Sequence, residues 1–159
     1  MTADDGPNIK EVPMATVLRK LILSTLVLGS LVASTGAVAV LKSQSQELAR
    51  IAARLATAGF QSVRTPVHGS LAESQNGWFT VYLRSDREYA IQGTCDDDCT
   101  DLDLDVTGPN GELVASDHDP DDVPQVRFVP WTSGTYRVTV QMYTCEIEPC
   151  AYAIGVYRR

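Results

Sequence analysis

The densest chemistry in this sequence lies between residues 95 and 124, CDDDCTDLDLDVTGPNGELVASDHDPDDVP, which hold eleven carboxylates and no Lys or Arg. Acids this close together repel one another unless a cation neutralises them. Ca²⁺ takes about six to eight oxygen ligands, mostly from carboxylates and carbonyls. We therefore expect a calcium site in this segment, formed by Asp101, Asp103, Asp117, Asp119 and Asp121.

The spacing of the acids indicates a strand. Asp101, Asp103 and Asp105 alternate with apolar residues, and Val106 stands where the loop of an EF-hand needs Gly. Neighbouring carboxylates on one face of a strand are about 7 Å apart, so a single ion needs ligands from a second segment as well. Residues 117–122 are the candidate. The alternative is a solvated acidic edge whose aspartates cap turns and bind no ion.

Four cysteines allow three disulfide pairings. The intervals DDD and EIEP are short and turn-like, which favours the pairs Cys95–Cys99 and Cys145–Cys150. In an extended strand, residues four apart are about 13 Å distant, so the chain must double back at both places. A zinc site is the weaker interpretation, because the spacings are not the C-x-x-C pairs of zinc ribbons. Disulfides are typical of proteins outside the cytoplasm.

The N-terminal segment predicts export. Leu21 to Leu41 carries no charge, follows Arg19 and Lys20, and ends in Ala37-Val38-Ala39, the small-x-small pattern of a signal-peptidase site. We expect residues 1–39 to be a signal peptide cleaved near Ala39, with Met14 as a start that leaves a normal basic n-region. The alternative is an uncleaved anchor, because 21 residues can cross a hydrocarbon core of about 30 Å. Either way the rest of the chain is predicted to be periplasmic or extracellular, in contact with a membrane only through an uncleaved segment.

Charge and motif content disfavour several functions. Residues 40–159 contain seventeen acidic and ten basic residues, so nucleic acid and anionic membrane surfaces are poor partners. This part has two histidines, His68 and His118, and no G-x-S-x-G, H-E-x-x-H or P-loop motif. We therefore predict that the protein is not an enzyme.

Residues 40–65 are predicted to form an amphipathic helix and a linker. Between Ser43 and Gly59, Leu48, Ile51 and Leu55 recur on one helical stripe, and Gly59 is a suitable residue to end the helix. This apolar stripe has two interpretations: it packs on the protein's own domain, or it docks on a partner protein. Residues 61–76 are predicted to form a linker and an entry strand, punctuated by Pro66, Gly69 and Gly77.

From residue 78 the periodicity becomes alternating. Seven strands are expected, at 78–84, 89–95, 102–107, 112–116, 126–130, 135–143 and 151–157. Turn residues fall between them, as in Gly108-Pro109-Asn110-Gly111, so residues 66–159 predict one all-β antiparallel sandwich. We interpret the aromatic residues as core and rim packing in preference to a sugar-stacking platform. They are Trp78, Phe79, Tyr89, Phe128, Trp131 and Tyr152.

The order of several segments carries a family resemblance. GWFTVYL at 77–83, DLDL at 101–104, GELVA at 111–115 and SGTYRVTV at 133–140 resemble the bacterial pre-peptidase C-terminal (PPC) domain family. The resemblance covers residues 66–158 and implies a jelly-roll-like sandwich, usually appended to secreted peptidases. It also implies an accessory role in which some members bind calcium or assist substrate attachment.

Together these observations predict an exported, non-catalytic binding or accessory module, stabilised by Ca²⁺ and directed at a protein or glycan surface. Two alternatives remain. One is a membrane-anchored structural subunit of an envelope complex, and the other is a small secreted hydrolase.

Overall fold

The computed structural model describes the backbone of residues 35–159 and the side chains of residues 45–159. Predictions that concern residues 1–34, among them the start at Met14 and the basic pair Arg19–Lys20, lie outside the described residues. The predicted cleavage site at Ala37 to Ala39 lies within the helix α1, Thr35–Thr57. No helix among the described residues is long and apolar enough to span a membrane.

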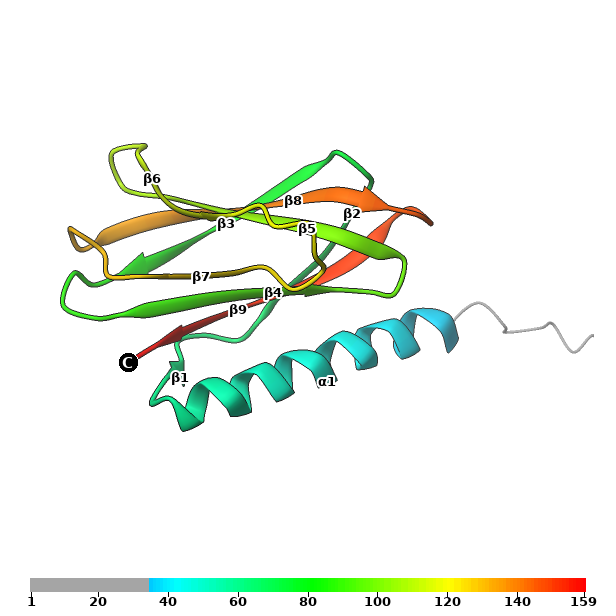
Figure 1. Ribbon diagram of the computed structural model, residues 1–159, viewed down its shortest axis with the longest axis horizontal. Coiled ribbons are helices and arrows are strands. Elements are labelled where there is room, and N and C mark those ends of the chain that lie inside the picture. The colour runs from blue at the N-terminus through cyan, green and yellow to red at the C-terminus, as the bar shows by residue number, and fades with distance from the viewer. Residues whose placement is uncertain (1–34) are drawn as a thin grey trace, which may run out of the picture. The chain divides into compact units, whose positions relative to one another are not determined.

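Two antiparallel sheets form a sandwich (Figure 1). The first sheet has the order β1-β9-β4-β7, with β2 also paired to β9, and the second has the order β3-β8-β5-β6. The five strands of the first sheet are β1 (Gln61–Ser62), β2 (Val67–Leu71), β4 (Tyr89–Cys95), β7 (Gln125–Phe128) and β9 (Cys150–Arg158). The strands of the second sheet are β3 (Asn76–Leu83), β5 (Cys99–Thr107), β6 (Leu113–Asp117) and β8 (Gly134–Cys145). The predicted all-β antiparallel sandwich preceded by a helix is confirmed.

The core between the sheets follows from alternation along the strands. In β8, Tyr136, Val138, Val140 and Met142 are fully buried, whereas Arg137 on the same strand is exposed. In β5 the apolar residues 102, 104 and 106 are fully buried. Each of these strands thus sends one set of side chains inward and holds the other set on an outer face.

Helix α1 packs on the outer face of the first sheet (Figure 1). Ile51 and Leu55 join Phe60, Ala90 and Tyr157 in a small apolar cluster. The predicted stripe is therefore buried against the protein's own domain and is not presented to a partner. The helix ends as predicted: the N–H of Gly59 donates to the carbonyl of Ala56 (3.0 Å) and that of Phe60 to the carbonyl of Leu55 (2.9 Å).

The segment predicted as a linker and an entry strand contains two short strands. β1 and β2 both pair with β9, at different positions along it. β1 has two exposed residues, too few to show a periodicity, whereas β2 alternates between partly buried and exposed side chains.

Both predicted disulfides are confirmed. Cys95 and Cys99 have Cα atoms 5.9 Å apart, and those of Cys145 and Cys150 are 5.8 Å apart. The two small loops lie side by side, because Cys99 pairs with Cys145 between β5 and β8. Backbone hydrogen bonds from Asp96 to Ala151 (3.0 Å) and from Glu146 to Asp98 (2.8 Å) join them further. We call this pair of loops the disulfide end.

Candidate binding surfaces

The predicted acidic residues of β5 alternate with the buried residues 102, 104 and 106 and therefore belong to the outer face of the second sheet. The segment 118–122 after β6 folds back toward this strand. The N–H of Leu102 donates to the carbonyl of Asp121 (2.9 Å), and His118 Nε2 lies 3.0 Å from Asp105 Oδ1. The two segments expected to share an ion are therefore neighbours.

Two of the predicted ligands have structural roles within this loop. Asp117 accepts the backbone N–H of Asp119 (3.1 Å) and of Gln125 (2.6 Å), and Asp121 accepts that of Val123 (2.9 Å). Asp119 is exposed. Within the part of the chain that the structure describes, no group of three or more His, Cys, Asp or Glu side chains is placed to hold a metal ion. The calcium site stays a prediction.

Asp103 and Asp101 are the unusual members of this surface. Asp103 is only 7% exposed, and burial raises the pKa of its carboxyl, while nearby His118 opposes the rise. Asp101 Oδ1 is buried with no hydrogen-bond donor. The pKa of the Asp101 carboxyl is raised too, mainly by burial and to a lesser extent by repulsion from Asp121. Two carboxyls are thus partly removed from water without full compensation, which costs free energy in the ionised state.

A different surface on the same sheet exposes aromatic side chains. Trp78 and Tyr82 lie on β3 and are 62% and 64% exposed. On the neighbouring strand β8, Thr139 lies opposite Trp78 and Arg137 lies opposite Thr80. The Arg137 guanidinium stacks over the Trp78 ring at 4.6 Å from its centroid, which holds the indole in place.

A groove of about 530 Å³ hollows the sheet beside these rings. Its floor comes from β3, β5 and β8, through Thr80, Thr107, Thr135, Arg137 and Thr139. Its wall is the tight turn at 108–111, in which the N–H of Gly111 donates to the carbonyl of Gly108 (3.0 Å). We call Trp78, Tyr82 and this groove the aromatic face.

The aromatic residues divide between core and surface. Tyr89 and Tyr152 are buried, as predicted, and Phe79 and Phe128 pack against the core while partly buried. The interpretation as packing residues is wrong for Trp78 and for Trp131, which is 90% exposed in the turn between β7 and β8. The signal for Trp78 is in the sequence, because Val81 and Leu83 on the same strand are apolar and alternation then directs residue 78 outward.

Comparison with known proteins finds several solved structures with a similar fold, among them the following two. No protein-family model matches the chain, and a search of the curated proteins returns no match. Aeromonas hydrophila PliG, a periplasmic lysozyme inhibitor of g-type lysozyme, is similar with a TM-score of 0.47 and 14% identity, covering 60% of this chain and 85% of that chain. The pre-peptidase C-terminal domain of collagenase from Bacillus anthracis has a TM-score of 0.46 and 14% identity, covering 58% of this chain and 87% of that chain. The second structure belongs to the family that the sequence motifs resemble, and both likenesses concern the fold alone.

Proposed function

We propose that this chain is an exported, non-catalytic binding module that holds a glycan on the aromatic face. The observation that carries the proposal is the exposed ring of Trp78 beside a groove lined by hydroxyl groups and a guanidinium. Trp78 and Tyr82 expose two aromatic rings on the same face of one strand, and such a pair beside a groove is a more specific feature than a single exposed ring such as that of Trp131.

The composition of the face matches the chemistry of sugars. A pyranose ring has an apolar C–H face, which packs on a flat aromatic ring, and a rim of hydroxyl groups, which need hydrogen-bond partners. Trp78 and Tyr82 are four residues apart on one strand, so their Cα atoms are about 13 Å apart and suit an extended oligosaccharide. Thr80, Thr135 and Arg137 lie in the groove beside them as donors and acceptors.

Export is supported by the two disulfides and by the uncharged N-terminal segment. A binding role without catalysis is supported by the lack of nucleophile motifs in the sequence.

The test uses the fact that the chain has two tryptophans, Trp78 and Trp131. In Trp131→Phe, the remaining tryptophan fluorescence reports on the aromatic face. Titration with cellohexaose and with chitohexaose is expected to change this fluorescence. Trp78→Ala is expected to weaken binding measured by calorimetry at least about tenfold, because the stacking surface is lost.

Trp131→Phe is the matched control, since it alters another exposed tryptophan outside the aromatic face. Equal affinity of Trp78→Ala and Trp131→Phe, with both variants folded, would place any binding elsewhere. If neither oligosaccharide binds the unaltered protein, the glycan proposal fails and a protein partner becomes the better explanation of the exposed aromatics.

A second proposal concerns cation binding at the acidic surface. It is favoured by the buried carboxyl of Asp103 and the unsatisfied oxygen of Asp101. A carboxylate oxygen that accepts one hydrogen bond retains a lone pair for a cation, so Asp117, with one bond on each oxygen, and Asp121, with one bond in all, can contribute after a small movement of the loop. We propose that Ca²⁺ binds here and stabilises the fold.

The prediction is that about 5 mM Ca²⁺, above the range of weak extracellular sites, raises the melting temperature and that a chelator reverses the change. Asp103→Asn should abolish the calcium effect, whereas Asp97→Asn, which removes an exposed acid from the disulfide end, should leave it intact. An unchanged melting temperature at this concentration would refute calcium stabilisation.

A further inference from the structure

Four arginines gather at one end of the sandwich, although the chain as a whole carries a net charge of −7. Arg84 and Arg87 come from the turn between β3 and β4, and Arg158 and Arg159 from the end of β9. Together with Gly59 and Gln61 they line a pocket of about 480 Å³. We call it the arginine pocket.

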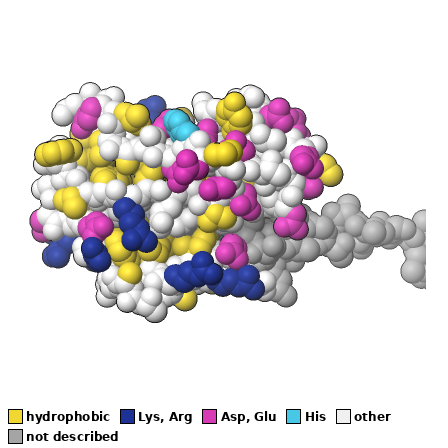
Figure 2. Space-filling view, viewed as in Figure 1, with side chains coloured by type: hydrophobic (Ala, Val, Ile, Leu, Met, Phe, Trp, Pro, Cys, Tyr) yellow, Lys and Arg dark blue, Asp and Glu magenta, His cyan; other side chains and the backbone are white. Residues whose placement is uncertain are grey.

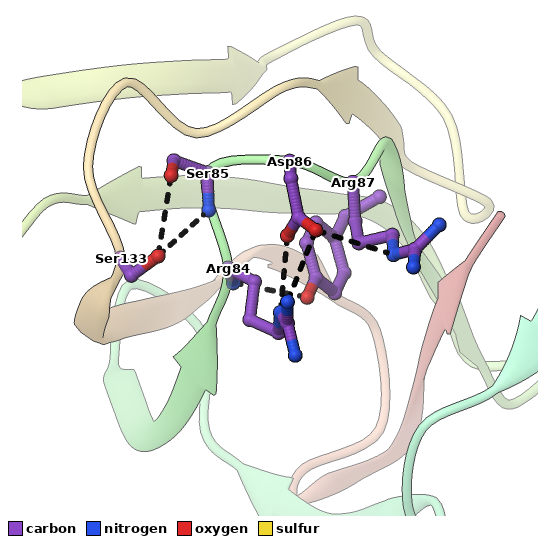
Figure 3. Close-up of polar contacts among 6 residues, drawn as sticks. Arg84, Ser85, Asp86, Arg87 and Ser133 are labelled. Carbon is purple, nitrogen blue, oxygen red and sulfur yellow. Dashed lines mark hydrogen bonds and ion pairs between the residues drawn. The ribbon is translucent and has the colours of Figure 1, made fainter.

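Carboxylates hold two of the four guanidinium groups by hydrogen bonds, and a third guanidinium lies near one of these carboxylates. Arg84 donates from Nε and Nη2 to the two oxygens of Asp86, at 3.0 Å each, and Arg87 Nε lies 3.8 Å from Asp86 Oδ2 (Figure 3). Arg159 Nε donates to Glu88 Oε2 at 2.6 Å. Such contacts hold a long side chain in one orientation before any ligand arrives.

The turn that carries Arg84 and Arg87 is itself held in place. The N–H of Ser85 donates to Ser133 Oγ (3.0 Å), which joins the turn to the loop between β7 and β8 (Figure 3). The N–H of Arg84 donates to the hydroxyl of Tyr89 (3.0 Å). The backbone at this edge of the pocket is therefore anchored.

The side-chain charges of the pocket do not balance. Four guanidiniums face two carboxylates, Asp86 and Glu88, which leaves an excess of positive side-chain charge. In the described part of the chain, Arg158 forms no ion pair with a side-chain carboxylate, and Arg87 has only the 3.8 Å contact with Asp86. Figure 2 shows that most basic side chains on the viewed face gather in its lower part, apart from the main group of acidic ones. Like charges held together in this way attract an anion.

We propose that the arginine pocket binds a tetrahedral oxyanion, the phosphate or sulfate group of a larger molecule. Guanidinium groups bind such oxyanions through pairs of parallel hydrogen bonds, and the excess positive charge favours an anionic ligand. Arg84, Arg87 and Arg159 are about half exposed, so the group can enter from solvent. The arginine pocket shares no lining residue with the groove of the aromatic face, so it is a separate site.

Calorimetric titration with inorganic phosphate and with sulfate, at an ionic strength kept constant with NaCl, tests the proposal. Both anions are expected to bind the unaltered protein, and Arg87→Ala/Arg158→Ala is expected to weaken binding at least about tenfold. Arg87→Lys/Arg158→Lys keeps the positive charge but loses the forked donors of arginine. Its affinity for the anions should therefore lie between that of the unaltered protein and that of the double alanine variant. Tighter binding of phosphate than of sulfate identifies a phosphorylated ligand, and the reverse order a sulfated one.

Arg54→Ala is the control, because it removes an exposed arginine of α1 that does not line the pocket. Equal weakening in Arg54→Ala and in the double alanine variant would reduce the effect to general electrostatics and overturn the proposal. So would a lack of binding by the unaltered protein. Neither result bears on Trp78, so failure here is distinguishable from failure of the glycan proposal.

Discussion

Individual carboxylates in this protein experience opposite environments. Asp86 accepts two hydrogen bonds from Arg84, and this pairing lowers the pKa of its carboxyl below the ordinary value of 3.8. Asp96, at the disulfide end, accepts the N–H of Ala151 (2.8 Å) through one oxygen, while its other oxygen is buried without a donor. Burial is the largest cause that raises the pKa of Asp96 above 3.8.

These two shifts predict opposite effects of pH on stability. A raised pKa in the folded state means that Asp96 stabilises the fold when protonated and that this contribution is lost as the pH rises through the folded pKa. The lowered pKa of Asp86 means that its contribution is present above pH 3.8 and is lost as the pH falls through the folded pKa. The melting temperature of the unaltered protein minus that of Asp96→Asn should therefore increase on acidification.

The same difference measured against Asp86→Asn should decrease on acidification over the same range. Melting curves of the three proteins between neutral pH and the region just below pH 3.8 check both signs. Parallel curves for the two variants would contradict the assigned environments.

At the scale of single residues, the sequence predicts the position of a side chain wherever that position depends on the alternation of apolar and polar residues along a strand. The outward position of Asp101, Asp103 and Asp105 follows from the apolar residues between them. The arginine pocket could not be predicted, because Arg84 and Arg158 are far apart in the sequence. They meet because β4 pairs with β9, with Tyr89 opposite Arg158. Long-range pairing of this kind has no local sequence signal.

Among the elements of the fold, too, some could be predicted from the sequence and others could not. The helix and the seven strands from β3 to β9 could be predicted because their periodicity is strong. The exact loop geometry of the acidic segment could not, since Asp117 and Asp121 bind backbone N–H groups in an arrangement that composition does not specify. The calcium prediction treats these two residues as ligands, whereas the alternative interpretation, aspartates that cap turns, describes the hydrogen bonds that they make in the structure.

The end of α1 provides a test at this scale. Gly59 has a φ of +86°, so a side chain there is strained even though the surrounding space is open, with no heavy atom beyond its two chain neighbours within 4 Å of where a Cβ would lie. Gly59→Ala should lower the free energy of unfolding by about 1 kcal/mol, because an L-residue with a Cβ disfavours the left-handed region. Urea denaturation measures the change.

Gly59→Asn is the graded control, because Asn tolerates left-handed backbone better than Ala. It should destabilise less than Gly59→Ala. An alanine variant as stable as the unaltered protein would mean that the helix does not end in the hydrogen-bonded turn that joins Gly59 and Phe60 to the last turn of α1.

For the molecule as a whole, charge is distributed unevenly. The disulfide end carries Asp96, Asp97, Asp98, Glu146 and Glu148 in its two loops and no basic residue within them. The arginine pocket lies where α1, β3 and β9 end. Attraction of a charged partner therefore depends on which part of the surface it approaches, and this preference weakens as salt screens the charges.

The position of α1 bears on the valency that the proposed glycan site would have. The helix lies on the outer face of the first sheet, against β9, β4 and β1, and among the described residues no helix lies on the outer face of the second sheet, which carries the aromatic face. Under the proposed function, one such face in each copy makes each copy monovalent. Such a protein coats a polymer without cross-linking it, and firm attachment would have to come from many copies displayed on one surface, by avidity.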